Sequence, residues 1–407
     1  MPYDPGLRGN GCPVFKKCGG CQLQNLTYPE QLDFKQGRAI ALLGRFGHVS
    51  RIIGMEEPYH YRCKVQAAFV RSRGGVLSGV YQSGSGRVVP VDSCMIEDEV
   101  CDAVVVTVRE LIRSFNIRPW DGRTGAVRHV LVRRGLYSGE VMAVLVTRTA
   151  QLPSKGAFVE ELIRLRPEIT TVVQNINADP LPLSLGKENV ALFGRGWIVD
   201  ELLGRTFRIS PDSFYQVNPA MTRTLYSTAL DFLELGGSEH VLDAYCGTGT
   251  IGVLAAERAK KVTGVEFNAD AVRDAKWNAR ENGIENIEFF RGDAAAFMEG
   301  MAKSGEKPDA LVMDPPRAGS SARFLRAVAA ASPEKIAYVS CEPETLARDL
   351  AVLTRSGYRV RRIQPVDMFP HTRHVETVCC LYLQKRDFIS VPYEPRNADY
   401  LKKNKSE

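Results

Sequence analysis

The chain has 407 residues, of which 44% are hydrophobic and 25% are charged. This length is enough for two or three domains with sizeable cores, and the composition excludes collagen-like, disordered and disulfide-stabilised miniprotein classes. The sequence has no run of roughly 18 apolar residues and no signal-peptide pattern, so we expect a cytoplasmic protein without a transmembrane helix. The formal net charge of +6 allows a nucleic-acid partner without requiring one.

A cysteine-rich loop and then a helical stretch make up residues 1–45. Cys12, Cys18 and Cys21 occur in CPVFKKCGGCQ, where the Gly-Gly pair lets the backbone fold tightly around an ion or a cluster. In a reducing cytosol, cysteines so close together indicate metal ligands rather than a disulfide framework.

Cys94, in VDSCMIED, is the best candidate for a fourth thiolate beside these three, ahead of Cys63 and Cys101. Four thiolates suit either a [4Fe–4S] cluster or a structural zinc ion. Zinc sites more often contain two CxxC pairs, whereas this region contains one, so the spacing favours the cluster.

Residues 46–204 contain several segments of alternating β-branched or aromatic residues, which predict a strand-rich domain interrupted by a short helix near 96–114. Basic and aromatic side chains on these strands are candidates to contact RNA phosphates and stack on bases, although a solvated sheet face is the alternative. These residues are Arg62, Lys64, Arg71, Arg73, Arg128, Arg133, Arg134, Tyr59, Tyr61 and Phe69.

Strands and helices alternate in residues 205–387, which predicts an α/β domain with a parallel sheet between two layers of helices. Its first strand leads into G-x-G-x-x-G, formed by Gly247, Gly249 and Gly252, and Glu266 ends the next strand 19 residues after Gly247. The glycines permit close approach of a ligand, and an acid at this spacing can bind ribose hydroxyls. Dinucleotide enzymes and S-adenosylmethionine enzymes share this geometry, so the motif alone leaves both open.

Further polar residues lie at strand ends, where open α/β sheets bind ligands. Asp243 precedes the glycine loop and is placed to face the amino-acid part of a methionine-derived cofactor. Asp293, in FFRGDA, is placed to reach an adenine amino group, and Asp314 begins Asp-Pro-Pro-Arg after a fourth strand. Before the first helix of this domain, Phe214 and Gln216 provide a ring and an amide that can stack on and hydrogen-bond a ligand.

Cys341 follows a buried strand and precedes a helix, a position that is expected to lower the pKa of its thiol and that suits a nucleophile. A packing role is the alternative. Glu376 lies where a loop enters the last strand, beside His371, Arg373 and His374, and solvated surface is the ordinary interpretation of such a residue. The polar segment 388–407 is predicted to be a loose tail.

Six motifs, in this order, resemble those of one family: CxxxxxCGGCxxQ, SFYQVN, DAYCGTGTIG, DPPRAG, VSCEPETLARD and FPHTRHVETV. This family is the S-adenosylmethionine-dependent RNA (uracil-5-)-methyltransferases of the RumA/TrmA type that carry an iron–sulfur cluster, and the resemblance spans about residues 12–385. It implies a Rossmann-like class I methyltransferase domain preceded by a β-rich RNA-binding domain with an iron–sulfur cluster loop.

The resemblance also assigns roles to individual residues. It implies that Cys341 is the nucleophile and Glu376 the base. The implied ligands of a [4Fe–4S] cluster are Cys12, Cys18, Cys21 and Cys94. The implied contacts of S-adenosylmethionine are Gln216, Tyr245, Glu266 and Asp314, to which we add Asp293.

The resemblance predicts methyl transfer to carbon 5 of a uridine in 23S rRNA, through a cysteine adduct at carbon 6 of uracil. The alternatives are the same chemistry on tRNA, a non-catalytic iron–sulfur RNA-binding protein, and an NAD(P)-dependent oxidoreductase. The tRNA-type enzyme generally lacks the cluster cysteines, which favours rRNA. Many members begin with a small β-barrel called TRAM, whereas this sequence starts almost at the cysteine loop, so we expect part of the usual RNA grip to be missing. We also expect a monomer without a membrane partner.

Overall fold

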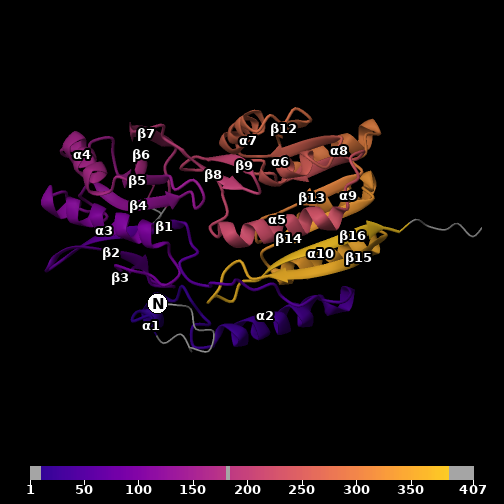
Figure 1. Ribbon diagram of the computed structural model, residues 1–407, viewed down its shortest axis with the longest axis horizontal. Coiled ribbons are helices and arrows are strands. Elements are labelled where there is room, and N and C mark those ends of the chain that lie inside the picture. Colours follow the sequence, from indigo (N-terminus) through magenta and orange to yellow (C-terminus); the bar gives the residue numbers. More distant parts are fainter. Residues whose placement is uncertain (1–10, 180–183, 385–407) are drawn as a thin grey trace, which may run out of the picture.

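The computed structural model describes residues 11–179 and 184–384 and has two lobes that lie side by side (Figure 1). The expected polar tail, 388–407, lies outside the described residues. Within the part of the chain that is described, no helix is long and apolar enough to cross a bilayer.

The first lobe is a seven-stranded sheet in the order β3-β2-β1-β4-β5-β6-β7. Its strands are β1 (Lys64–Ser72), β2 (Gly75–Tyr81), β3 (Val88–Pro90), β4 (Val127–Arg134), β5 (Val141–Thr147), β6 (Ile169–Ile176) and β7 (Glu188–Phe193). Only β5 and β6 among these pairs are parallel, because helix α4 (Lys155–Leu165) supplies the crossover that a parallel pair needs. Together with α3 (Glu99–Ser114), it closes a hydrophobic core against one face of the sheet.

The second lobe is a seven-stranded sheet in the order β12-β11-β10-β13-β14-β16-β15. Its strands are β10 (His240–Ala244), β11 (Lys261–Glu266), β12 (Ile287–Arg291), β13 (Ala310–Met313), β14 (Lys335–Ser340), β15 (Tyr358–Val366) and β16 (Glu376–Leu383). The first five are parallel, as predicted, but β16 runs antiparallel to both β14 and β15. The physical reason is length: residues 367–375 are too few for a crossover, so the chain turns back.

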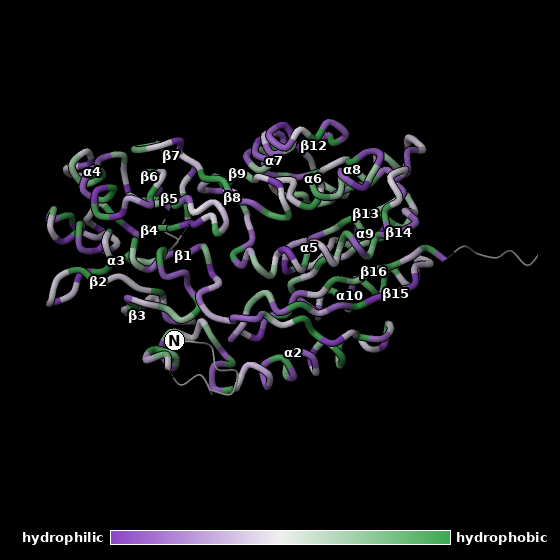
Figure 2. Tube along the Cα trace, viewed as in Figure 1, coloured by the Kyte–Doolittle hydropathy of each residue, from purple (hydrophilic) through white to green (hydrophobic). Residues whose placement is uncertain are grey.

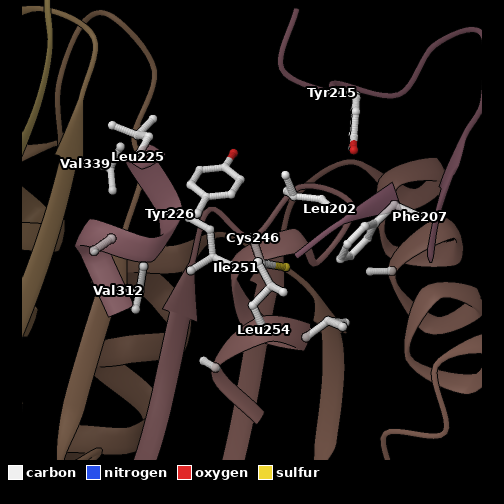
Figure 3. Close-up of a cluster of buried hydrophobic side chains, with 14 of the residues drawn as sticks. Leu202, Phe207, Tyr215, Leu225, Tyr226, Cys246, Ile251, Leu254, Val312 and Val339 are labelled. Atoms are coloured by element: carbon white, nitrogen blue, oxygen red, sulfur yellow. The ribbon is translucent and has the colours of Figure 1, made fainter. Parts of the chain in front are cut away.

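Successive residues of these strands point to opposite faces, and each face has its own hydrophobic core. Val241 and Val312 pack with α5 (Pro219–Leu233), α6 (Thr250–Ala256) and α7 (Ala269–Glu281) on one face. Their neighbours Leu242 and Leu311 pack on the other face. The helices of that second face are α8 (Ala294–Ser304), α9 (Ala322–Ala331) and α10 (Pro343–Arg355). Apolar strands inside more polar helices are visible in Figure 2, and Figure 3 shows part of the first core.

The N-terminal segment crosses from one lobe to the other. After α1 (Phe15–Cys18), helix α2 (Tyr28–Leu43) runs along the second lobe and contacts α10 and β15 (Figure 1). A capping box between Thr27 and Glu30 starts this helix. The short helix η1 (Gly44–Phe46) ends the crossing, and bridges from residues 49 and 53 then extend the sheet beyond β15. Near the other side of the boundary, β8 (Ile198–Leu202) and β9 (Arg205–Ile209) form a hairpin that joins the lobes.

Candidate active site

A cavity of about 570 Å³ opens at the carboxyl ends of β10, β11, β13 and β14. This is the edge at which open α/β sheets bind ligands, and the volume suits a small molecule. The cavity is lined by Phe214, Tyr215, Gln216, Thr222, Tyr226, Asp243, Tyr245, Cys246, Gly247, Thr248, Thr250, Ile251, Glu266, Asp314, Pro315, Pro316, Arg317, Cys341, Phe369 and Glu376. All sequence-predicted catalytic and cofactor residues except Asp293 therefore meet in one place.

Cys341 and Glu376 are brought together by the antiparallel pairing of β14 with β16. Ser340 pairs with Thr377 at the end of this ladder, so the next position along each strand is occupied by Cys341 and Glu376. Directly opposed residues of an antiparallel pair have Cβ atoms about 4.5–5.5 Å apart. The reversed direction of β16 thus places the first residue of that strand beside the residue that follows β14.

Three carboxyl groups face the cavity with little access to water. Desolvation raises the pKa of Asp243 to about 8, that of Asp314 to about 7 and that of Glu376 to about 8. The charge of Asp314 raises the pKa of Glu376 further, whereas Arg317 opposes this shift. Because a cation would stabilise the ionised form of each group, the cavity is suited to a positively charged ligand.

The thiol of Cys341 does not have the lowered pKa that its position before a helix predicts. Desolvation, the carboxyl group of Glu376 and that of Asp314 raise its pKa to about 12, and only Arg317 and a backbone hydrogen bond act the other way. The prediction is wrong because two acidic neighbours and burial outweigh the start of α10. In the ligand-free protein, Cys341 is therefore a neutral thiol.

The glycine loop and Glu266 form the other end of the cavity. The Gly247 N–H donates to Glu266 Oε2 (3.1 Å), and the Asn268 N–H donates to Oε1 (2.8 Å), so both carboxylate oxygens are fixed. A Cβ atom at position 252 would lie 2.9 Å from Asp243 Oδ2, so only glycine lets α6 approach the strand this closely. A Cβ atom added at Gly247 would meet no atom within 4 Å, which leaves room on that side for a ligand next to the carboxylate that suits ribose hydroxyls.

Gln216 lies at the start of α5 next to Asn218, which the sequence predicts as the cap of this helix, and Tyr226, which the sequence did not single out. Asn218 caps α5 by accepting from the Met221 N–H (3.2 Å). Tyr226, further along the same helix, is buried and forms a hydrogen bond with Gln216. Figure 3 shows the Tyr226 ring beside Cys246 of the glycine loop. Phe369 was also missed as an individual residue, although it lies within FPHTRHVETV; an apolar residue in a loop carries no separate signal.

Asp293 does not line the cavity that contains the other predicted residues, although its charge acts on Tyr245 at the cavity wall. Its carboxylate caps α8 by accepting from the Ala296 N–H (2.9 Å), and Arg323 lies 3.4 Å from it. The local reason is that residues 292–293 turn from β12 into α8, where an aspartate is a favoured cap.

The four predicted cluster cysteines line a second cavity, of about 460 Å³. Arg317 and Phe369 line both cavities, so the cysteine loop adjoins the candidate active site. Burial raises the pKa of Cys21 and of Cys94 to about 12. Among the described residues, no group of three or more His, Cys, Asp or Glu side chains is arranged to hold a metal ion.

Part of the expected RNA-contacting set is buried and has structural partners. Arg133 donates to the Ser213 carbonyl (2.6 Å), Arg128 to the Asn177 carbonyl (3.0 Å), and Tyr61 to the Pro370 carbonyl (3.0 Å). Phe69 lies in the core of the first lobe. The expectation is wrong for these four residues, because their side chains are buried. Arg128 and Arg133 lie on β4, which is buried at every position but its last, and Tyr61 lies just before β1 in the interior. Arg71 and Arg73 are exposed.

Comparisons with known proteins decide between the cofactor classes that the glycine motif left open. A sequence model described as tRNA (Uracil-5-)-methyltransferase matches residues 198–386. An uncharacterised RNA methyltransferase of Clostridium tetani is 42% identical, over 90% of this chain and 81% of its own length. Another, from Halalkalibacterium halodurans, is 43% identical over 92% and 83%. This chain belongs to the RNA (uracil-5-)-methyltransferase family.

A solved structure supports the same assignment. The tRNA (uracil-54, C5)-methyltransferase of Pyrococcus abyssi, in complex with S-adenosyl-L-homocysteine, has a TM-score of 0.74 and 28% identity, and the match covers 89% of this chain and 86% of that chain. The expected enzyme class, an RNA methyltransferase that uses S-adenosylmethionine, is confirmed, as is the Rossmann-like domain. S-adenosylmethionine is the cofactor that the family uses, and an oxidoreductase with a dinucleotide is not supported.

Proposed function

We propose that this RNA (uracil-5-)-methyltransferase methylates carbon 5 of a uridine in 23S rRNA through a covalent adduct with Cys341. The observation that carries the proposal is the β14–β16 register, which sets Cys341 and Glu376 at opposed positions inside the cavity. A nucleophile and a base side by side at the wall of one cavity are the two groups that this reaction needs.

Carbon 5 of uracil is a weak nucleophile, and addition of a thiolate at carbon 6 activates it. Cys341, a neutral thiol in the ligand-free protein, first gives its proton to solvent, and the positive charge of the bound methyl donor would favour this loss. As the Cys341 sulfur bonds to carbon 6, the electron pair of the C5=C6 bond moves onto carbon 5 and the adjacent carbonyl. Bound S-adenosylmethionine supplies an electrophilic methyl group and a positive charge. Carbon 5 takes that methyl group, and the electron pair of the broken S–CH₃ bond stays on sulfur.

Glu376 then removes the proton from carbon 5. The electron pair of the C5–H bond restores the C5=C6 bond, and the C6–S bond breaks to return the thiolate of Cys341. A pKa of about 8 suits a group that must accept a proton and later release it near neutral pH. The cation next to Asp314 and Glu376 would favour their ionised forms, and an ionised carboxylate is then available to take the proton.

The uracil must leave its stack to enter this cavity, so a flipped base in a loop of RNA is the expected substrate. Exposed Phe214, 65% accessible, stands at the cavity wall where such a base would pass. The cysteine loop supports rRNA over tRNA as the target. The tRNA alternative is favoured by the name of the matching family and by the Pyrococcus abyssi relative.

We also propose that the four cysteines hold a [4Fe–4S] cluster with a structural or RNA-contacting role and no redox step. The four cysteines line one cavity, and the charges of Cys18 and Cys12 act on the thiol of Cys21, so these three lie near one another. Four thiolates suit a [4Fe–4S] cluster or a zinc ion, and the single CxxC pair favours the cluster. Gly19, at φ +73°, and Gly20 give the loop the bend that such wrapping requires.

The test is methylation of unmodified 23S rRNA and of tRNA by the wild type, Cys341→Ala and Cys379→Ala, with 5-methyluridine measured by mass spectrometry. Cys379 lies in the core of β16 outside the cavity, so its variant is the matched control. We expect 5-methyluridine in rRNA from the wild type and the control only. Product in tRNA alone would overturn the choice of substrate. Product from Cys341→Ala would overturn the nucleophile, and its absence in every sample with intact protein would favour a non-catalytic RNA-binding protein.

A further inference from the structure

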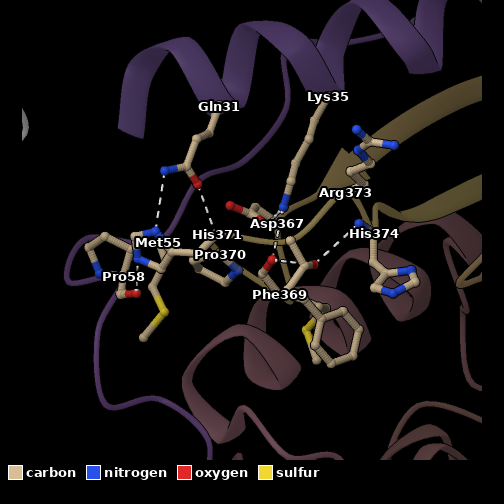
Figure 4. A network of polar contacts seen from close by, with 12 residues as sticks. Gln31, Lys35, Met55, Pro58, Asp367, Phe369, Pro370, His371, Arg373 and His374 are labelled. Atoms are coloured by element: carbon tan, nitrogen blue, oxygen red, sulfur yellow. Dashed lines mark hydrogen bonds and ion pairs between the residues drawn. The ribbon is translucent and has the colours of Figure 1, made fainter. Parts of the chain in front are cut away.

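The loop between β15 and β16, residues 367–375, carries the proposed base into the cavity. Glu376 follows it directly, and Phe369 and His374 project from it toward the two cavities. Figure 4 shows that this base loop lies beneath helix α2, which comes from the other end of the chain. No residue of α2 has a role in the proposed chemistry, so the function of its contacts with the base loop has to be explained separately.

A fully buried ion pair joins α2 to the start of the base loop. Lys35 Nζ lies 2.5 Å from Asp367 Oδ1, and both side chains have no exposed surface. Lys35 also donates to the carbonyl of Phe369 (2.9 Å), and the Tyr28 hydroxyl donates to Asp367 Oδ2 (2.9 Å). Burying a lysine is costly unless it is paired, and well-packed apolar residues often stabilise a fold as well as such a pair does. The pair instead fixes the path of the loop, because Lys35 binds both the side chain of Asp367 at the start of the loop and the carbonyl of Phe369 two residues later.

The middle of the base loop is fixed through His371, whose backbone is in the left-handed region (φ +68°). Gln31 Oε1 accepts from the His371 N–H (2.9 Å), and Gln31 Nε2 lies 3.2 Å from His371 Nδ1. The other ring nitrogen is 2.9 Å from the Pro58 carbonyl. The His371 carbonyl accepts from the N–H groups of Gln22 (3.0 Å) and Leu23 (2.9 Å). Every polar group of this residue is therefore held by the N-terminal part of the chain.

These contacts determine where the base sits. The loop has no regular structure of its own and runs from the end of β15 to the start of β16. Ile53, Asn218 and Tyr61 hold its backbone at Asp367, Met368 and Pro370, and Lys35 and Gln31 add the contacts at Asp367, Phe369 and His371. Without them, the path between the strands is less constrained, and a displacement of about 1 Å at a reacting group can lower a rate by about 10²-fold.

We propose that Lys35 and Gln31 are positioning residues, which act through the base loop to hold Glu376 at carbon 5 of the target uracil. The inference rests on the proposed function, because it assigns the residues to the proton-removal step. It predicts a specific failure. Addition of Cys341 and methyl transfer should continue, while release of the methylated product slows.

The test compares Gln31→Leu with Gln36→Leu. Gln36 is a matched control on the same helix: it is also buried and its amide also joins two backbone groups, accepting from the Ile52 N–H (2.6 Å) and donating to the Ser50 carbonyl (3.2 Å), but it does not reach the base loop. Lys35→Met, which keeps the length of the side chain, is the stronger variant. For each protein, kcat and KM are measured together with the fraction of enzyme bound to RNA after denaturation, using methyl-labelled S-adenosylmethionine.

We expect kcat of Gln31→Leu to fall about 10- to 100-fold with little change in KM, and the labelled covalent adduct to accumulate several-fold above wild type. Gln36→Leu should do neither. If Lys35→Met fails to fold, Gln31→Leu still decides. A loss of activity without adduct, in proportion to loss of folded protein, would show a merely structural role and overturn the inference, as would unchanged kinetics.

Glu376→Gln separates this inference from the proposed function. If Glu376→Gln accumulates the adduct but Gln31→Leu does not, the positioning role is wrong and the covalent route stands. If neither the wild type nor Glu376→Gln ever forms an adduct, the covalent route is wrong and the inference falls with it.

Discussion

Glu376→Gln is expected to stabilise the protein against unfolding at neutral pH while abolishing turnover. In the unfolded chain this glutamate ionises with a pKa of 4.5, whereas in the folded protein burial raises its pKa to about 8. Between these two values the folded state holds a proton that the unfolded state has released. Stability therefore falls as pH rises through this window, and glutamine, which cannot ionise, escapes the loss.

The magnitude follows from the width of the window. Each pH unit between 4.5 and the working pH lowers the free energy of unfolding by about 1.4 kcal/mol, as long as Glu376 stays protonated in the folded protein. At pH 7 the cost is of the order of 3 kcal/mol, and at pH 5 it is below about 1 kcal/mol. Since a domain is stable by only about 5–15 kcal/mol, the base is held at a large cost, as expected where function needs a desolvated carboxyl group.

The measurement is denaturant unfolding of wild type and Glu376→Gln at pH 5 and pH 7, followed by tryptophan fluorescence. The rings of Trp197 and Trp277 lie 5.2 Å apart between the β8 hairpin and α7, so their emission reports loss of the fold. The difference in free energy of unfolding should grow by about 2 kcal/mol from pH 5 to pH 7 in favour of the variant. A difference that is equal at both pH values, or a variant that is less stable at pH 7, would refute the reasoning.

Three further predictions concern the ligands. Gly252→Ala should weaken binding of S-adenosylhomocysteine at least about 10-fold and destabilise the protein by about 1–3 kcal/mol, because the new methyl group would lie 2.9 Å from Asp243 Oδ2. Calorimetry measures both effects. The control is Gly300→Ala, whose Cβ meets nothing within 4 Å and which should bind the ligand as the wild type does. Cys18→Ser should lose iron and sulfide on anaerobic purification while Cys101→Ser retains them, and equal iron in both would exclude the assigned ligand set. S-adenosylmethionine should bind more tightly at pH 9 than at pH 6, because the three cavity carboxyl groups then ionise and attract its sulfonium charge. Binding of S-adenosylhomocysteine, which lacks the sulfonium charge, should change less, and equal pH dependence of the two would contradict the assigned electrostatics.

Local patterns in the sequence predicted much of the second lobe. Alternating strands and helices, the glycine loop and the acid at the end of the next strand are short-range features, because backbone geometry and strand direction bring strand ends to one edge. That is why Glu266, Asp314 and Cys341 are predictable at one sheet edge, whereas Tyr245 and the cofactor role of Gln216 came from the family resemblance.

Other features depend on contacts between distant segments. The direction of β16, which puts Glu376 opposite the nucleophile, depends on a connection too short for a crossover. The high pKa of Cys341 depends on carboxyl groups from two other strands. The burial of Lys35 depends on a partner 332 positions away. A lysine in the middle of a helix ordinarily faces water, and its sequence neighbours carry no sign that it does not.

The difference between the features that the sequence predicts and those that depend on the tertiary structure has one physical cause. Periodicity and turn chemistry are set by a few consecutive residues and can be read from them. Desolvation and Coulomb interactions are set by whatever the fold places within a few ångströms, and they act on groups that the chain separates by hundreds of positions. The sequence by itself therefore determined which residues reach the sheet edge, and the tertiary structure decided how they are charged, which of them face each other, and what holds the base loop in place.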